Sequence, residues 1–377
     1  MPRTPLQLPD FPWDSLEPFA ARAKSHPGGI VDLSVGSPVD PTPAIIRESL
    51  ALATDAHSYP ATAGSVALRE AIVSWYARRR NVTDLSVANV LPTIGSKELI
   101  AGLALWLGLG PGDVVVQPAR AYPTYAVGAA LVGATVVASD DPAEWPEGTR
   151  LIWINSPGNP NGRIMDVAQL RSAVARAREL GAIIVSDECY AELAWEAPYA
   201  TEAGRSLATP SILDPRVIAG DRSSVLSVYS LSKQSNLAGY RAGFVAGCGE
   251  LIAELLAVRK NLGLMPPAPV QVAMVTALGD DAHVDAQRAL YRARRDLLKP
   301  AVEGAGLRVD DSAGGLYLWA TAGEDAWRTV ERLADLGILV APGSYYGDET
   351  SQHVRIALTA SDESIATAVA RLATLSN

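Results

Sequence analysis

The fold is constrained most by a series of short, uniformly apolar runs that are separated by helical segments. The runs are Val114–Val116, Leu151–Ile154, Ala182–Ser186, Val225–Tyr229 and Phe244–Ala246. Between them lie segments with helical periodicity, such as Val167–Leu180. Strands that are apolar on both faces are typical of parallel sheets covered by helices on each side. The pattern therefore predicts an α/β domain with a mostly parallel, buried sheet.

The segments before these runs predict a helix, a strand and a second helix. Ser65–Arg80 has the periodicity of an amphipathic helix. We expect the arginines that end it, Arg78–Arg80, to be solvated, because cations are favourable near a helix C-terminus. Val90–Ile94 is a candidate strand, and Gly95-Ser96 then opens the next helix.

The pattern changes after residue 281, where a charged helix is followed by short strands and further helices. These segments are Ala286–Leu298, Leu307–Val309, Gly315–Trp319, Ala326–Leu336, Ile338–Val340 and Val354–Leu358. They predict a smaller α+β domain. The strand-like Ile30–Leu33 lies outside the alternating series, so we expect it to join that domain. The expected division is a large domain over residues 45–280 and a small domain of residues 1–44 with 281–377.

Composition excludes several classes of partner. The 377 residues carry a formal net charge of −9, which argues against binding to nucleic acid or to an acidic lipid surface. The longest uncharged stretches, residues 121–139 and 261–279, contain prolines and glycines and do not have the pattern of a membrane span. The four histidines lack the spacing of metal ligands. With two cysteines and no secretory signal, we expect a soluble, cytoplasmic protein.

Polar residues gather where the predicted strands end, and ligands bind outside the carboxyl ends of the strands in a parallel α/β sheet. These residues are Gly95, Ser96 and Lys97 at a helix start, Asn159, Asp187 with Tyr190, and Lys233 with Arg241. A helix start suits a phosphate. A lysine whose pKa is lowered by desolvation or by a nearby cation can act as a nucleophile. Together with a buried carboxylate, a phenol and an amide, these groups fit pyridoxal 5'-phosphate.

Three segments carry a family resemblance. They are Ser156–Gly162, Ser186–Tyr190, and Ser230–Lys233 closed by Gly239–Arg241. In this order they resemble the signature segments of the class I/II (fold-type I) aminotransferases. The resemblance extends from Tyr59-Pro60 near the start to Val354–Ile356 near the end. It implies a fold-type I pyridoxal-phosphate-dependent transferase, with a large α/β domain around a mostly parallel sheet and a smaller α+β domain.

The resemblance also implies a role for each residue of the site. Lys233 would bind the cofactor aldehyde and move the substrate proton, and Asp187 would pair with the ring nitrogen. The rest of the cofactor would be held by Asn159 and Tyr190 at the ring oxygen, Tyr122 on the ring face, and Ser96, Ser230, Arg241 and the Gly95 backbone at the phosphate. Tyr59 would reach the phosphate from a second subunit, so the family implies a homodimer with shared active sites.

The resemblance also implies which residues bind the substrate and what the substrate is. Arg355 would grip the α-carboxylate as a bidentate fork, helped by Asn159 and the backbone at Gly36. Longer segments resemble actinobacterial-type N-succinyldiaminopimelate aminotransferases, and they are Phe11–Asp14, Asp32–Pro43, Leu91–Leu99 and Ser235–Phe244. The implied reaction exchanges an amino group between glutamate and N-succinyl-2-amino-6-oxopimelate, in diaminopimelate and lysine biosynthesis. That substrate carries several carboxylates, so we expect a second cation, and Lys97 beside the phosphate loop is the candidate.

Other functions stay open. A class I/II aminotransferase of different specificity, or a C–S lyase of the same fold, would use the same cofactor residues. A binding module that keeps the fold without turnover is a third alternative. Ser230 and Lys233 also match the Ser-x-x-Lys of penicillin-binding enzymes, but no Ser-Asp-Asn or Lys-Thr-Gly accompanies them. Gly247-Cys248-Gly249 begins a dinucleotide fingerprint, but Ile252 stands in the place of its third glycine.

Overall fold

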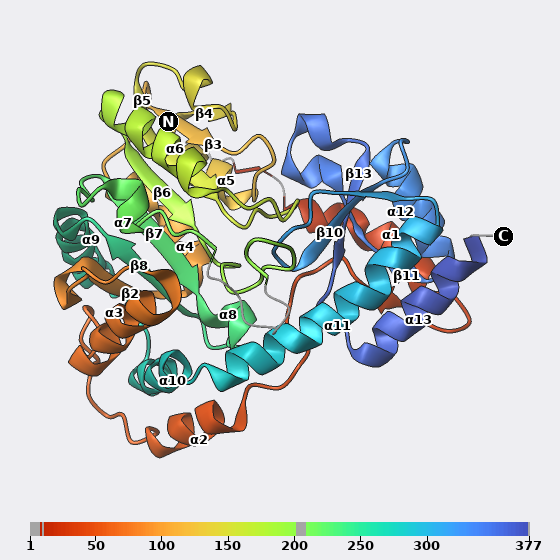
Figure 1. Cartoon of the computed structure of the whole chain (residues 1–377), viewed down its shortest axis with the longest axis horizontal. Helices are drawn as coiled ribbons and strands as arrows, with labels where there is room; N and C mark the ends of the chain where they lie inside the picture. The colour runs from red at the N-terminus through yellow and green to blue at the C-terminus, as the bar shows by residue number, and fades with distance from the viewer. Residues whose placement is uncertain (1–7, 10, 201–208, 376–377) are drawn as a thin grey trace, which may run out of the picture.

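The computed structural model describes residues 8–9, 11–200 and 209–375. Within them a seven-stranded sheet has the strand order β2-β8-β7-β6-β5-β3-β4 (Figure 1). Its strands are β2 (Val90–Ile94), β3 (Val114–Gln117), β4 (Thr135–Ala138), β5 (Thr149–Asn155), β6 (Ile183–Asp187), β7 (Val225–Ser230) and β8 (Ala242–Gly247). From β4 to β7 the neighbouring strands are parallel, whereas β8 is antiparallel to both β7 and β2. The predicted mostly parallel sheet is confirmed.

Consecutive residues of the central strands pack into two different cores, which explains the uniformly apolar runs. In β5, Ile152 and Ile154 belong to one core, while Leu151 and Trp153 belong to the core on the other face. The helices of this part of the chain are α2 (Ala44–Leu52), α3 (Val66–Arg80), α4 (Gly95–Trp106), α5 (Thr124–Val132), α6 (Val167–Glu179), α7 (Pro215–Ile218), α8 (Leu231–Gln234), α9 (Gly249–Leu262) and α10 (Ala268–Gly279). Residues of α3, α6 and α10 fill the first core, and residues of α4, α5 and α9 fill the second.

The remaining strands form two smaller sheets. An antiparallel sheet has the order β12-β13-β10-β9, and the two-residue strands β1 and β11 pair in parallel. These strands are β1 (Val31–Asp32), β9 (Arg308–Asp310), β10 (Tyr317–Thr321), β11 (Ile338–Leu339), β12 (Ala341–Pro342) and β13 (His353–Ala357). The helices here are α1 (Glu17–Lys24), α11 (Ala282–Gly304), α12 (Ala326–Asp335) and α13 (Asp362–Leu372). Their apolar faces share a third core with these strands.

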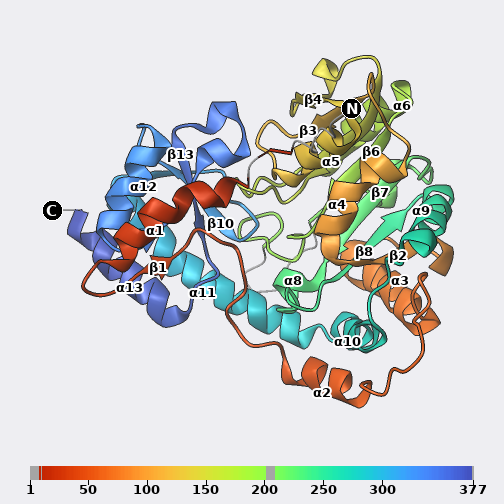
Figure 2. The same cartoon turned by 180° about the vertical axis from the view of Figure 1, so that it is seen from behind.

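Helix α11 connects the two parts of the molecule. In Figures 1 and 2 it extends from the neighbourhood of α8 and α10, beside the large sheet, to α13 beside the small one. Arg294 on α11 forms ion pairs with Asp40 at 2.6 Å and with Asp362 at 2.7 Å. The segment before α2 is thereby held to the same helix as α13.

The prediction that Arg78–Arg80 are solvated was wrong for the last two residues. Arg80 is 1% exposed and its guanidinium lies 2.9 Å from the Glu188 carboxylate. Arg79 forms an ion pair of 2.5 Å with Glu192, and this carboxylate is buried, as that of Glu188 is. Both carboxylates follow β6, so the last turn of α3 is pinned to the segment just beyond that strand.

Every helix of the described residues is too short or too polar to cross a bilayer. The same residues bring together no group of three or more His, Cys, Asp or Glu side chains that could hold a metal ion. Cys189 and Cys248 are both free thiols.

Candidate active site

A cavity of about 750 Å³, here called the strand-end cavity, lies where β5, β6 and β7 end and where β10 and β13 approach them. Most of the residues that the sequence predicted for the site line it. They are Gly36, Ser96, Lys97, Tyr122, Asn159, Asp187, Tyr190, Ser230, Lys233, Arg241 and Arg355. Gly95 lies beside it, at the first position of α4. The fold therefore brings together residues that are more than 300 positions apart in the chain.

Lys233 is held on the short helix α8, directly after β7. Ser230 caps this helix, and its hydroxyl accepts a hydrogen bond of 3.2 Å from the Ser232 N–H. The Lys233 amine donates to the carbonyl of Gly36. Burial lowers the pKa of the amine below its ordinary value, and the nearby cations Arg355 and Arg241 act in the same direction, while the Tyr317 phenol opposes them. The amine is thus biased toward the uncharged form that a nucleophile requires.

Asp187 ends β6 and is 6% exposed. One carboxylate oxygen accepts from the Cys189 N–H at 3.1 Å, and the other accepts from the Tyr125 hydroxyl at 2.9 Å. Burial raises the pKa of this carboxyl, and the hydrogen bonds from Cys189 and Tyr125 oppose the rise. Since both donors are neutral, the buried anion has no cationic partner among the described residues.

The opposite end of the cavity is suited to an anion. The first turn of α4 begins at Gly95, and a helix start presents backbone N–H groups and the positive end of its dipole. A β-carbon at Gly95 would lie 2.5 Å from the Arg241 guanidinium, so this position has no room for a side chain. Ser230 adds a hydroxyl that bonds the Ser232 hydroxyl at 2.9 Å. The two serines and Arg241 line the cavity at this end.

Arg355 is a buried cation, 2% exposed, without a carboxylate partner among the described residues. Its guanidinium donates to the Asn159 side-chain oxygen at 3.0 Å and to the Ser34 carbonyl at 2.7 Å. The ring of Tyr317 lies 3.9 Å from the guanidinium carbon. The Nε of Arg355 has no hydrogen-bond partner among the described residues. A buried guanidinium in this state is a receptor for a carboxylate.

The loop after β5 orients Asn159. The side-chain oxygen of Asn155 accepts the Asn159 N–H at 2.7 Å, and its amide donates to the Asp187 carbonyl at 2.8 Å. Asn155 thus ties the loop to the end of β6. On the far side of the cavity the hydroxyls of Tyr190 and Tyr317 are 3.2 Å apart.

Two of the predicted residues lie apart from this group. Tyr59 is 96% exposed and does not line the cavity within the chain. Lys97 lines the rim, where its amine lies 5.6 Å from the centre of the Phe11 ring. It makes no ion pair with any described residue.

Comparison with known proteins decides the family. The model of the family "Aminotransferase class I and II" matches residues 29–372. The chain belongs to the class I and II aminotransferases. This aminotransferase has the fold-type I architecture that the sequence predicted, and pyridoxal 5'-phosphate, on which the family depends, is its cofactor.

Several relatives resemble this aminotransferase over nearly its full length. It is 53% identical to the 4-dedimethylamino-4-oxo-anhydrotetracycline transaminase OxyQ of Streptomyces rimosus, over 97% of this chain and 99% of that protein. It is 54% identical to the probable aminotransferase Rv1178 of Mycobacterium tuberculosis, over 97% of this chain and 85% of the relative. The solved structure of N-succinyldiaminopimelate aminotransferase from Mycobacterium tuberculosis is similar with a TM-score of 0.84, at 27% identity and with 96% of each chain covered.

The residues of this aminotransferase fit pyridoxal 5'-phosphate. The buried Asp187 carboxylate has only neutral donors and so lacks the cation that a protonated ring nitrogen provides. The start of α4, with Ser230 and Arg241, suits the phosphate, and Lys233 would supply the amine for the aldehyde. An anion for the ring nitrogen (Asp187), a cation for the phosphate (Arg241) and an amine for the aldehyde (Lys233) thus line one cavity.

Sequence reasoning missed several residues of the site. Tyr125 lies in the first turn of α5, three positions after Tyr122, which precedes the helix, and its N–H donates to the Tyr122 carbonyl at 3.1 Å. Tyr317 lies in a strand that was predicted, but its direction toward the cavity depends on the register of β10 with β13. The ring of Trp13 lies 5.8 Å from the Arg355 guanidinium, although the two residues are at opposite ends of the chain. No local sequence pattern predicts this contact.

Proposed function

We propose that this aminotransferase exchanges an amino group between glutamate and N-succinyl-2-amino-6-oxopimelate, a step in diaminopimelate and lysine biosynthesis. The observation that carries the proposal is the pair of cations in one cavity, Arg355 in its wall and Lys97 at its rim, neither paired with a carboxylate of the described residues. A substrate with carboxylates at both ends complements this pair. The similarity to a solved N-succinyldiaminopimelate aminotransferase structure supports this substrate.

The chemistry of the proposed half-reactions divides among residues of the cavity. Pyridoxal 5'-phosphate supplies an electron-accepting ring that stabilises negative charge at the substrate α-carbon. Lys233 would hold the cofactor aldehyde, and its amine, whose pKa is lowered by burial, would take up the α-proton of the substrate. Asp187 would keep a proton on the ring nitrogen. Asn159 and Tyr190 would donate to the ring oxygen, and Tyr122 would cover a face of the ring.

Binding of the two ends of the substrate uses different parts of the cavity. Arg355 pairs with the α-carboxylate, and Asn159 already orients its guanidinium through the 3.0 Å hydrogen bond. The carbonyl of Gly36 forms the adjoining wall. Ser96, Ser230, Arg241 and the Gly95 backbone hold the cofactor phosphate. Lys97 is then free to meet a distal carboxylate at the rim.

A second acceptor class is favoured by one observation. The rim of the cavity carries the rings of Phe11 and Trp13, whose centroids lie 5.5 Å apart, and the tetracycline transaminase named above is 53% identical to this chain. A ring-containing ketone would pack against these side chains. The second candidate is therefore an aminotransferase whose acceptor is an apolar or polycyclic ketone.

The assembly is part of the proposal. We assign residues 45–280 to a large domain and residues 1–44 with 281–377 to a small domain, and we place the strand-end cavity between them. The enzyme is a cytoplasmic homodimer in which Tyr59 of one subunit serves the phosphate of the other. Its nearly complete exposure in the single chain supports this role.

A donor and acceptor screen tests the substrate. With glutamate as donor, the acceptors are N-succinyl-2-amino-6-oxopimelate, small oxo acids and aromatic ketones, and formation of 2-oxoglutarate is measured for each. We expect the highest kcat/KM for the succinylated acceptor. A higher value for an aromatic ketone would establish the second candidate instead. Release of pyruvate and ammonia from a cysteine-type substrate, without amino transfer, would identify a C–S lyase.

The variant Lys97→Gln separates the role of the rim cation from that of the rest of the site. It should raise KM for the succinylated acceptor about tenfold, the effect of one charge-assisted hydrogen bond, while KM for glutamate stays unchanged. Lys260→Gln, which removes an exposed lysine of α9 far from the cavity, is the matched control. Equal KM values in Lys97→Gln and the control would reject this assignment of Lys97.

A further inference from the structure

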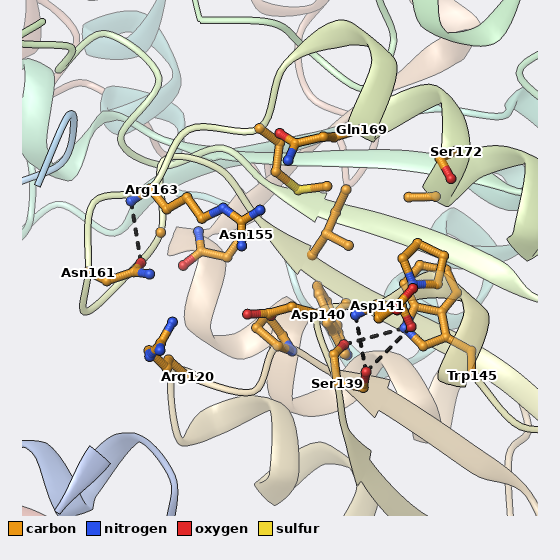
Figure 3. A pocket seen from close by; sticks show the side chains of 17 residues that line it. Arg120, Ser139, Asp140, Asp141, Trp145, Asn155, Asn161, Arg163, Gln169 and Ser172 are labelled. Carbon is orange, nitrogen blue, oxygen red and sulfur yellow. Dashed lines mark hydrogen bonds between the residues drawn. The ribbon is translucent and has the colours of Figure 1, made fainter. Parts of the chain in front are cut away.

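A second cavity of about 400 Å³, here called the α6 cavity, lies between α6 and the ends of β3, β4 and β5 (Figure 3). Among the described residues that line the two cavities, Asn155 is the single one common to both. The α6 cavity is therefore a separate space rather than an extension of the strand-end cavity. Its volume is within the range of about 300–1,000 Å³ that small-molecule sites occupy.

Two arginines of this cavity lack partners. Arg120 is half-buried and Arg163 is exposed, and neither makes a side-chain hydrogen bond or an ion pair with any residue that the structure describes. Figure 3 shows both on the side of the cavity where Asn155 and Asn161 lie. Two unpaired guanidinium groups at one cavity favour an anion, with the bidentate geometry that carboxylates accept.

The two acidic residues of the lining are already engaged. Asp140 accepts the Ala119 N–H at 3.1 Å, and Asp141 accepts the Ala143 N–H at 2.9 Å as the cap of a short 3₁₀ turn, Pro142–Glu144. Neither forms an ion pair with the arginines of the cavity. The two aspartates balance the charge of the two arginines in the lining, but they form no direct ion pair with them, so the guanidinium groups keep donors that a ligand can use.

The rest of the wall is apolar and aromatic. Trp145 lines the cavity, as do Ile154, Met165 and Pro142. Trp153 also borders it, but its side chain belongs to the core on the other face of the sheet, where its ring stacks on Tyr125. The Trp145 indole N–H is satisfied by the Ser139 carbonyl at 3.3 Å, so it presents apolar surface to the cavity without an unmet donor. Flat apolar groups pack well against indole rings.

We propose that the α6 cavity binds a small carboxylic acid with a flat apolar body, whose carboxylate lies against Arg120 and Arg163 and whose body packs against the tryptophan-lined wall. The ligand class follows from this division of the lining into two unpaired cations and an apolar surface. The site is independent of the proposed substrate of the aminotransferase.

Calorimetric titration of the holoenzyme with indole-3-acetate tests the proposal. We expect one binding event per chain. Indole-3-acetamide, which keeps the ring and lacks the charge, and acetate, which keeps the charge and lacks the ring, should each bind at least about tenfold more weakly. Absence of saturable heat up to about 10 mM indole-3-acetate, or equal binding of the acid and its amide, would overturn the proposal.

Variants locate the binding event. The double variant Arg120→Gln/Arg163→Gln should weaken binding about tenfold or more, while Arg150→Gln, an exposed arginine of β5 outside the cavity, should leave it unchanged. Ser172→Phe, which adds bulk from α6 and removes no charge, should also prevent binding. Arg355→Gln should bind indole-3-acetate as the parent does. Loss of binding in Arg355→Gln, with retention in the double variant, would assign the acid to the strand-end cavity and refute the proposal.

Discussion

Tyr125 is one of the two residues whose hydrogen bonds lower the pKa of Asp187. Its hydroxyl donates to the carboxylate at 2.9 Å, and its ring stacks on Trp153 with centroids 5.0 Å apart. Tyr125→Phe keeps the ring and removes the donor, so the pKa of Asp187 rises and this carboxyl would more readily take the proton that should stay on the ring nitrogen of the cofactor. We expect kcat to fall about tenfold, since a hydrogen bond to a charged group contributes about 1.5–3 kcal/mol.

Tyr346→Phe is the matched control for that variant. Tyr346 is 1% exposed, and its hydroxyl has no hydrogen-bond partner among the described residues. Its removal should leave kcat unchanged and should not reduce the thermal midpoint. Steady-state kinetics give kcat for both variants, and thermal unfolding checks that both are folded. Equal kcat in the two phenylalanine variants would contradict the role given to Tyr125.

The pKa of Lys233 offers a test based on pH. Burial lowers this pKa, and Arg355 is one of the cations that lower it further. In Arg355→Gln the pKa of the amine therefore rises, and a smaller fraction is uncharged at neutral pH. We expect the apoenzyme variant to combine with pyridoxal 5'-phosphate more slowly at pH 7 and to approach the parent rate as pH increases. Stopped-flow absorbance measures the profile.

Arg328→Gln is the control for the pH profile. Arg328 lies on α12, away from the strand-end cavity, so its removal should not move the midpoint. A midpoint in Arg355→Gln equal to that of the control would show that Arg355 does not influence the amine.

Residues of the site could be predicted where a short motif fixes both identity and place. Lys233 and Asp187 each follow an apolar strand, and the shared edge of a parallel sheet brings them together. Tyr317 could not be found in this way, because its contact with Arg355 depends on the register in which β10 pairs with β13. Burial of Arg355 and its lack of a carboxylate partner are likewise properties of the folded chain.

At the scale of whole elements, the end of α3 shows what a local pattern cannot reveal. Three adjacent arginines predicted a solvated helix end, but Glu188 and Glu192 lie more than 100 positions away and meet Arg80 and Arg79 through the fold. The central strands were predicted closely, because a strand buried on both faces is apolar throughout. The reversed direction of β8 has no such signal, since apolar content is the same in either direction.

The Arg80–Glu188 pair should anchor α3 to the large sheet. Arg80→Met leaves the Glu188 carboxylate buried with hydrogen bonds from Ser211 and the Ile212 N–H but without a cation. We expect the free energy of unfolding to fall by about 3–5 kcal/mol, the usual result of breaking a buried pair on one side. Urea unfolding followed by circular dichroism measures the loss. Arg80→Met/Glu188→Gln should recover much of it, because the glutamine carries no charge.

Arg78→Met is the control within the same helix. Arg78 pairs with Asp281 at 3.0 Å in a partly exposed position, so its removal should cost about 0–1 kcal/mol. If Arg80→Met were no less stable than Arg78→Met, the anchoring role of the buried pair would be rejected.

The exposed position of Tyr59 raises a question about the whole molecule. A tyrosine that is 96% exposed gains nothing from burial within its own chain. If it serves the phosphate site of a partner, as proposed above, Tyr59→Phe should weaken cofactor binding about tenfold through loss of one charge-assisted hydrogen bond. The tenfold effect alone does not distinguish a residue of the same chain from one of the partner, whereas subunit exchange does.

Mixing Tyr59→Phe chains with an excess of Lys233→Ala chains tests the sharing of sites. In a mixed dimer, the site that keeps Lys233 receives an intact Tyr59 from the inactive chain, so activity should again saturate at the cofactor concentration of the parent enzyme. The control replaces Lys233→Ala with Tyr59→Phe/Lys233→Ala, which forms the same dimers but has no tyrosine to contribute. Activity measured against added pyridoxal 5'-phosphate reports only on sites with Lys233. Identical curves for the two mixtures would place Tyr59 in the site of its own chain, because exchange would then supply nothing.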